Sequence, residues 1–155
     1  MLMAAMTGVF GSISGAQPVL AASKASDSAW NLSDDVWRER LTAEAYHVLR
    51  NEGTERPFTS SLNDEKRPGN YHCAGCDQPL FSSQAKFNSG TGWPSFFEPL
   101  EGGVATKVDF KLIIPRTEYH CSRCGGHQGH VFNDGPRPTG KRYCNNGVAL
   151  RFQPA

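Results

Sequence analysis

Four of the five cysteines in this 155-residue chain fall into two Cys-x-x-Cys pairs, and each pair directly follows a Tyr-His dipeptide. A gap of two residues lets both thiolates of a pair point at one ion, and two such pairs supply the four soft ligands of a tetrahedral zinc site. A site with four protein ligands has no open position for chemistry. The sequence therefore predicts one structural Zn²⁺, held by Cys73, Cys76, Cys121 and Cys124.

Two other interpretations of the paired cysteines stay open from the residues alone. The pairs would form disulfides in an oxidising compartment if the chain is exported. A thioredoxin-like redox pair is the second alternative, although the βαβ pattern of that fold is missing. The segment between the pairs, residues 77–120, exceeds the usual zinc-ribbon spacing, so sheet topology must bring the pairs together.

The fifth cysteine, Cys144, stands alone in the stretch "RYCNN". Residues two apart on a strand share a face, so Arg142, Cys144 and Asn146 are expected to point together. In "HQGHVFND" the same alternation places His130 and Phe132 on one face. The turn-rich "NDGPRPTGK" can fold this strand back beside the Cys144 strand, which would bring a thiol, histidines, an arginine and an aromatic ring together.

Thiolate attack is the chemistry that such a group offers. Arg142 and a protonated histidine stabilise the nucleophilic thiolate, and a histidine can also deliver a proton to a leaving or reduced oxygen. The alternative is that Cys144 is a small buried hydrophobic residue and that the His127–His130 pair is structural. The other histidines lack comparable neighbours and are expected to be structural or exposed: His47, His72 and His120.

A second dense element is "SGTGWPSFF", which spans Ser89 to Phe97. Gly90 and Gly92 permit backbone conformations closed to other residues, and Pro94 stiffens the exit, so the loop holds Trp93 firmly. Trp93 is then either part of the core or an apolar wall for a methyl or thioether group of a ligand.

The elements expected to position these residues are two helices at the start of the domain and the strands that follow them. Ser33 and Thr42 are typical N-cap residues and predict two short helices, and the polar segment 53–69 predicts a loop with Phe58 as its apolar anchor. No helical pattern follows, which excludes parallel βαβ units and predicts a mainly β fold with antiparallel sheets. The expected strands are Asn70–Cys73, Leu80–Ser82, Val104–Lys107, Phe110–Ile114, Thr117–Cys121, His130–Phe132, Lys141–Cys144 and Val148–Phe152.

Charge and composition narrow the domain organisation and the partners. Residues 1–30 are small and apolar with few charges and are expected to be a flexible or cleavable segment, whereas residues 31–155 form one domain. A net charge of +1 disfavours nucleic acid and anionic membranes, and no later apolar run approaches the ~20 residues of a membrane span. The compartment stays open: cytoplasm or, if the first segment is a signal, an exported or organellar location.

Several blocks of the sequence together resemble one family. They are "GTERPF", "YHCAGCDQPLF", "KFNSGTGWPSFF" and "CGGHQGHVFNDGPRPTGKRYCNNGVALRF", in order from about Trp37 to Phe152. The chain is similar in these blocks to the methionine sulfoxide reductases of the B type. The resemblance implies two antiparallel sheets with short N-terminal helices. It also implies an oxidoreductase that returns methionine R-sulfoxide in proteins to methionine, as protein repair in oxidative stress.

The resemblance also implies roles for individual residues. Cys144 would attack the sulfur of the sulfoxide and be left as a sulfenic acid. His127 and His130 would orient and protonate the sulfoxide oxygen. Trp93, with Phe132 beside it, would form a wall against the S-methyl group. Arg142 would support the thiolate, and Asn146 would complete the polar network. The zinc ligands would be Cys73, Cys76, Cys121 and Cys124.

One departure from the family pattern bears on how the reaction ends. Many relatives have a cysteine between the two glycines before the tryptophan, where this chain has Thr91, so it resembles the subset with a single catalytic cysteine. With four thiols on zinc, an external thiol must reduce the sulfenic acid: thioredoxin, glutaredoxin or glutathione. The other expected partners are oxidised proteins or peptides, and the expected state is a monomer. Gln128, Asn145 and Gly147 also depart from the commonest pattern.

Two other functions are compatible with parts of the sequence. A zinc-ribbon module that binds nucleic acid or protein would leave Cys144 inert, but the chain lacks a basic stripe. A Cys-His hydrolase would cleave esters or amides and leave sulfoxides untouched.

Overall fold

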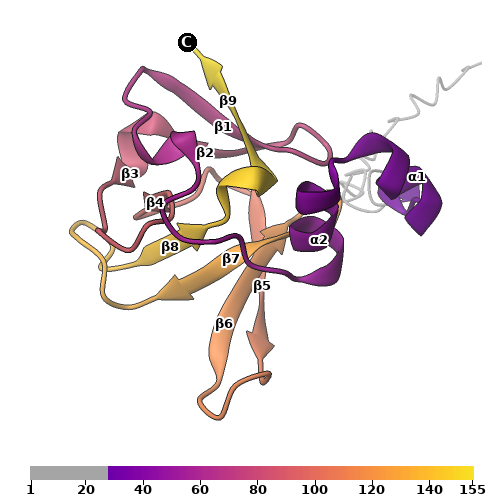
Figure 1. Cartoon of the computed structure of the whole chain (residues 1–155). Helices are drawn as coiled ribbons and strands as arrows, with labels where there is room; N and C mark the ends of the chain where they lie inside the picture. Colours follow the sequence, from indigo (N-terminus) through magenta and orange to yellow (C-terminus); the bar gives the residue numbers. More distant parts are fainter. Residues whose placement is uncertain (1–27) are drawn as a thin grey trace, which may run out of the picture.

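The computed structural model describes residues 28–155, which Figure 1 shows as two sheets with a pair of helices beside them. The expected flexible or cleavable segment, residues 1–30, thus lies outside the described residues except for its last three. These three, Ser28–Trp30, form a 3-10 turn, and the ring of Trp30 stacks on Trp37 with centroids 6.3 Å apart. Within residues 28–155, no helix has the length and apolar character needed to cross a membrane.

Two capped helices open the domain, as predicted. Helix α1 spans Asp34–Arg40, and the side chain of its N-cap Ser33 accepts a hydrogen bond from the backbone one turn later. Helix α2 spans Ala43–Asn51 and is capped in the same way by Thr42. It ends where Glu52 adopts the left-handed conformation, with φ of 53°. Each cap satisfies a backbone donor that the first turn of a helix leaves unpaired. Because this interaction is local, the cap residues predict where a helix begins.

All strand pairs are antiparallel and form two sheets, which confirms the expected class of fold. A three-stranded sheet has the order β2-β1-β9, and a six-stranded sheet has the order β3-β4-β8-β7-β6-β5. In Figure 1 the β5–β6 hairpin projects away from the rest of the molecule. The strands are β1 Gly69–Cys73, β2 Pro79–Ser82, β3 Lys86–Phe87, β4 Ser95–Phe96, β5 Val104–Asp109, β6 Arg116–Cys121, β7 His127–Phe132, β8 Arg142–Asn145 and β9 Leu150–Pro154.

The expected strand Phe110–Ile114 is wrong. These residues form the loop that closes the β5–β6 hairpin, whose last pair is Asp109 with Arg116. Their apolar side chains are exposed, and Ile113 is fully so. An apolar run alone cannot make a strand when no neighbouring strand is left to pair with it. The two-residue strands β3 and β4 were not expected, because they are too short to carry an alternating pattern.

The loop over residues 53–69 has a different anchor from the expected one. The side chain of Phe58 is 74% exposed, so the prediction that it anchors the loop is wrong. Leu62, in the 3-10 turn Ser61–Asn63, packs against the core instead. Two further 3-10 turns, Ser83–Ala85 and Gly147–Ala149, follow β2 and β8.

An aromatic core joins the two sheets. Phe81 of β2 stacks on Phe96 of β4 with ring centroids 4.2 Å apart, and Tyr71 of β1 meets Phe96 edge-on at 4.9 Å. On another side, Arg50 of α2 donates a hydrogen bond of 2.9 Å to the carbonyl of Cys124. Strand β8 lies between β4 and β7 and is therefore paired along both of its edges.

Candidate functional site

Cys144 lies in the middle of the six-stranded sheet. Its register partner on β7 is His130, and its partner on β4 is Ser95. The neighbours of Cys144 in sequence turn to the opposite face: the Tyr143 ring lies 5.2 Å from that of Tyr119, and Asn145 is buried. The alternation predicted for this strand is therefore confirmed.

A small cavity of about 130 Å³ opens over the thiol. Five of the residues predicted for the site line it: Trp93, His130, Phe132, Cys144 and Asn146. The other lining residues, which sequence reasoning did not single out, are Thr54, Arg116 and Gly129. Two predicted residues, His127 and Arg142, lie outside the lining. The arrangement places one thiol, one imidazole and two aromatic side chains around a space of side-chain size.

Gly129 explains how β7 and β8 come so close together. A Cβ atom on Gly129 would lie 1.8 Å from the carbonyl oxygen of Cys144, which no side chain can tolerate. Glycine between the two histidines of "HQGH" is thus a packing requirement of the strand pair that holds the nucleophile.

The surroundings of Cys144 act on its acidity in opposite directions. Burial raises the pKa of the thiol above its ordinary value, while the charge of Arg142 and hydrogen bonds from Thr91 and Arg142 lower it in part. Arg142 is itself held by Asp134 through two hydrogen bonds of 2.9 and 3.0 Å, and its guanidinium lies 4.3 Å from the centre of the Phe132 ring. Arg142 therefore supports the thiolate from beside the cavity, against a net upward shift of the pKa.

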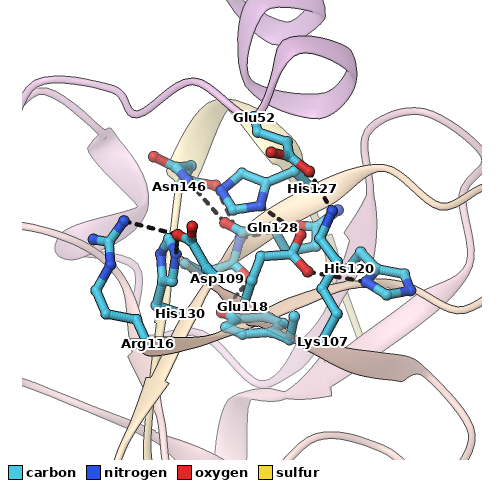
Figure 2. Close-up of polar contacts among 12 residues, drawn as sticks. Glu52, Lys107, Asp109, Arg116, Glu118, His120, His127, Gln128, His130 and Asn146 are labelled. Atoms are coloured by element: carbon cyan, nitrogen blue, oxygen red, sulfur yellow. Dashed lines mark hydrogen bonds and ion pairs between the residues drawn. The ribbon is translucent and has the colours of Figure 1, made fainter. Parts of the chain in front are cut away.

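Each of the two predicted histidines is held by a carboxylate from the β5–β6 hairpin, as Figure 2 shows. His127 is buried, and its Nδ1 lies 2.7 Å from Oε1 of Glu118. His130 places Nε2 at 2.7 Å from Oδ2 of Asp109. The two imidazole centroids are 5.5 Å apart. Sequence reasoning missed both carboxylates, because only the register of three strands brings them to the histidines.

His120 has a carboxylate partner that the sequence did not lead us to expect. Its Nδ1 lies 3.1 Å from the second carboxylate oxygen of Glu118, so this histidine and His127 share one acidic partner. A signal for this was available: Glu118 and His120 are two apart on β6 and so lie on one face of the strand.

Glu55 connects the tryptophan loop to the end of β8. Its carbonyl accepts a hydrogen bond of 3.1 Å from Nε1 of Trp93, and its backbone N–H donates to Oδ1 of Asn146 at 2.9 Å. Its carboxylate accepts from the backbone N–H groups of Gly147 and Val148. Glu55 belongs to the quoted block "GTERPF", but sequence reasoning gave it no role. It sets the distance between the wall and the floor of the cavity.

The four paired cysteines form one buried cluster, and all their sulfur atoms lie within 4.8 Å of one another. The Sγ atoms of Cys73 and Cys124 are 3.7 Å apart, and those of Cys76 and Cys121 are 3.5 Å apart. A tetrahedral ion with ligands at ~2.3 Å needs sulfurs about 3.8 Å apart, whereas a disulfide needs ~2.05 Å. The separations fit a metal ion, and all five cysteines are free.

Gln128 connects the cysteine cluster to strand β8. Its Nε2 donates to Sγ of Cys73 at 3.4 Å, and its Oε1 accepts from Nδ2 of Asn145 at 3.1 Å. Tyr119 donates its hydroxyl to Oδ1 of the same asparagine at 2.8 Å. The polar residue at position 128, noted as a departure in the sequence, is therefore satisfied inside the core.

Comparison with known proteins identifies the family. Residues 41–154 match the model of the SelR domain. The chain is 52% identical over 124 residues to peptide methionine sulfoxide reductase B1, chloroplastic, of Oryza sativa subsp. japonica, which covers 79% of this chain and 58% of that protein. It is 54% identical over 125 residues to peptide methionine sulfoxide reductase MsrB of Agrobacterium fabrum, which covers 80% and 93%. The match to the Methanosarcina barkeri protein of that name is 55% over 122 residues, covering 78% and 86%.

The match spans about three fifths of the rice protein and of its chloroplastic Arabidopsis thaliana counterpart, and most of the bacterial and archaeal proteins. Among solved structures, the Mis18 'Yippee-like' domain has a TM-score of 0.45 and 20% identity over 57% of this chain and 98% of that chain, too low to carry an argument. The family model and these relatives match the same large part of this chain. The chain belongs to the SelR domain family, whose model matches residues 41–154.

Proposed function

We propose that this protein is a peptide-methionine (R)-S-oxide reductase that repairs oxidised methionine in proteins. The observation that carries the proposal is the pairing of Cys144 with His130 across β7 and β8, at the floor of a cavity walled by Trp93 and Phe132. Membership of the SelR domain family supports the same reaction. Neither the zinc-ribbon binding module nor the Cys-His hydrolase finds comparable support.

In the first step the sulfur of Cys144 bonds to the sulfoxide sulfur while the sulfoxide oxygen takes up one proton. The resulting hydroxyl group then moves to the sulfur of Cys144: its bond to the methionine sulfur and the bond between the two sulfurs both break, and methionine leaves. Methionine sulfur is reduced by two electrons, and Cys144 is oxidised by two to a sulfenic acid. His127 and His130 orient and protonate the sulfoxide oxygen, either directly or through water.

Binding in the cavity selects the substrate. The ring of Trp93, held through its Nε1 by the carbonyl of Glu55, supplies a wall for the S-methyl group, with Phe132 beside it. Arg142 supports the negative charge on the attacking sulfur. Asn146, whose side chain bonds to the backbone of Glu55 and of Gln128, completes the polar network around the reacting atoms.

An external thiol finishes the reaction. One thiol attacks the sulfenic acid to give a mixed disulfide and water, and a second thiol releases Cys144 with formation of the external disulfide. Thioredoxin, glutaredoxin and glutathione are the candidate reductants. In the loop before Trp93, the side chain within hydrogen-bonding reach of Cys144 is that of Thr91, which cannot form a disulfide, and the other four thiols lie together in the metal cluster.

The metal cluster is proposed to hold one structural Zn²⁺. The four sulfurs of Cys73, Cys76, Cys121 and Cys124 supply the soft, closed ligand set that this ion prefers. When bound, the ion ties the β1–β2 turn to the β6–β7 turn and takes no part in the redox step. We further propose a monomer whose catalytic domain is residues 31–155, with residues 1–30 flexible or cleavable, and with no nucleic-acid or membrane partner.

The sharpest test traps the oxidised form of Cys144. The protein, reduced and zinc-loaded, is mixed with a peptide that contains methionine R-sulfoxide, without reductant and with a sulfenic-acid trap, and its mass is measured after digestion. We expect an adduct on Cys144 in proportion to the methionine formed. Methionine formation without oxidation of Cys144 would refute the mechanism.

A further inference from the structure

The β5–β6 hairpin brings two buried carboxylates to the two histidines of β7. Asp109 ends β5, and Glu118 lies within β6 as the register partner of His130. Their side chains are 9% and 3% exposed. Figure 2 shows that each carboxylate faces one histidine of β7 and has a second partner, which is Arg116 for Asp109 and His120 for Glu118.

Three donors fix the carboxylate of Asp109. Its Oδ1 accepts the backbone N–H of Lys111 at 2.9 Å, and its Oδ2 receives Nη2 of Arg116 at 2.9 Å and faces Nε2 of His130 at 2.7 Å. These contacts hold the pKa of Asp109 well below its usual range, the backbone bond first. An ionised carboxylate with no freedom to rotate fixes the plane of the imidazole that it touches.

Glu118 is held between two rings on neighbouring strands. Its Oε1 faces Nδ1 of His127 at 2.7 Å, and its Oε2 faces Nδ1 of His120 at 3.1 Å. Burial alone would favour the neutral acid, but the hydrogen bonds from His120 and His127 bring the pKa of Glu118 down to about 2. The carboxylate is therefore charged at neutral pH and occupies Nδ1 of each ring.

A carboxylate on one ring nitrogen has two effects on a histidine. It decides which nitrogen carries the proton in the neutral ring, and it stabilises the imidazolium that forms when the ring takes up a second proton. The charged and titratable groups around His130 are Asp109, Arg116 and its register partner Glu118 from the hairpin, His127 on the same strand, and Cys144 on β8. Burial lowers the pKa of His130, and Asp109 is the group that opposes this most.

We propose that Asp109 and Glu118 are positioning residues that set the ring orientation and the proton location of His130 and His127 in the reduction. Neither carboxylate needs to touch the substrate, because each acts through its histidine. The inference rests on the proposed function, and it assigns the β5–β6 hairpin a part in the site: its register decides the state of both histidines.

The first test uses Asp109→Asn, which keeps the size of the side chain and removes its charge. The matched control is Asp77→Asn, which removes a surface carboxylate that pairs with Arg151 at 2.7 Å. In the full-length, zinc-loaded protein, the pKa of His130 is measured by NMR titration of labelled histidine. We expect it to fall in Asp109→Asn, to return toward the wild-type value in Asp109→Glu, and to stay unchanged in Asp77→Asn. An unchanged His130 titration in folded Asp109→Asn overturns the proposal for this pair.

The second test is a pair of double-mutant cycles on kcat. Asp109→Asn and Glu118→Gln should each lower kcat by roughly 10–100-fold with little change in KM, since orienting partners of a functional histidine typically matter by that factor. In the His130→Asn and His127→Asn backgrounds, respectively, the same changes should cost less than about twofold. Glu65→Gln, which removes a partly buried carboxylate that pairs with the exposed Arg67, serves as the control for Glu118→Gln. Full additivity in both cycles overturns the inference.

The two readouts separate the inference from the proposed function. The NMR titration needs no turnover, so it tests the Asp109–His130 link even in a protein that reduces no sulfoxide. If the wild type fails to reduce methionine R-sulfoxide while His130 still responds to Asp109→Asn, the proposed function fails and the positioning stands. If the wild type is active and the cycles are additive, only the positioning fails.

Discussion

His130 and Cys144 are direct register partners on adjacent antiparallel strands. Paired residues on such strands have Cβ atoms ~4.5–5.5 Å apart, so the separation of the proposed proton donor and the proposed nucleophile is set by backbone hydrogen bonding and needs no loop. A slip of one residue would turn Cys144 into the aromatic core and bring Tyr143 or Asn145 to the cavity. The sheet itself is thus the device that assembles the proposed site.

Replacement of Cys144 by serine should abolish reduction of methionine R-sulfoxide. Serine keeps the size of the side chain but is a far weaker nucleophile at neutral pH. The measurement is chromatography of a methionine sulfoxide peptide, with the S epimer as a control substrate and zinc content measured in parallel. The metal should stay bound, since its four proposed ligands are other residues. Activity retained in Cys144→Ser would sink the mechanism.

The pH dependence of Cys144 alkylation should reveal the effect of Arg142 on the pKa of the thiol. Burial raises the pKa of this thiol, so little thiolate exists at neutral pH and alkylation speeds up as pH rises toward the raised value. Arg142→Met removes a charge that lowers the pKa, so the rate at pH 7 should fall by roughly 3- to 10-fold while the plateau at high pH is unchanged.

The controls for this experiment are Arg142→Lys, which keeps the charge, and Arg151→Met, which removes an exposed arginine on β9. Site-resolved mass spectrometry after iodoacetamide treatment follows Cys144 alone. A plateau that falls together with the rate at pH 7 would indicate lost access to the thiol, and the electrostatic role of Arg142 would then be wrong.

The four-cysteine cluster predicts a strong link between metal and stability. Cys76→Ser removes one of four buried ligands, and chelation removes the ion altogether. If the ion contributes even ~4 kcal/mol to the free energy of unfolding, its loss lowers Tm by roughly 8–16 °C in a domain of this size. Metal analysis and calorimetry check this, with Cys144→Ser as the matched control. A metal-free protein with an unchanged Tm would contradict a structural ion.

Features that depend on local rules were predictable from the sequence. The caps at Ser33 and Thr42 satisfy nearby backbone groups, and the period of two along β8 decides which side chains accompany Cys144. The spacing of the paired cysteines is equally local, and only their meeting needed the fold. For these reasons the helices, the antiparallel class and most of the cavity residues agree with expectation.

Features that depend on long-range register were not predictable. Asp109 and Glu118 reach the histidines only because β5, β6 and β7 pair in one particular register, which a single sequence does not encode in any short pattern. The apolar run Phe110–Ile114 has strand-like composition, yet the hairpin closes before it and leaves it exposed. The role of Glu55 was not predictable, because its backbone N–H and carbonyl form hydrogen bonds with Asn146 and Trp93, which are distant from it in sequence.

Thr91→Cys should convert the proposed mechanism from external to internal regeneration. Thr91 is close enough to Cys144 to offer its thiol a hydrogen bond, and it lies in the loop just before Trp93. A thiol at this position can attack the sulfenic acid of Cys144, with loss of water and formation of an intramolecular disulfide. After one turnover without reductant, the wild type should carry a trappable sulfenic acid, and Thr91→Cys should instead be lighter by two hydrogens than its reduced form.

Thr139→Cys, which places a thiol in the β7–β8 turn, is the control and should behave as the wild type does. A sulfenic acid that persists in Thr91→Cys would mean that position 91 cannot reach the reacting sulfur, and the explanation for the dependence on an external thiol would have to be sought elsewhere in the site.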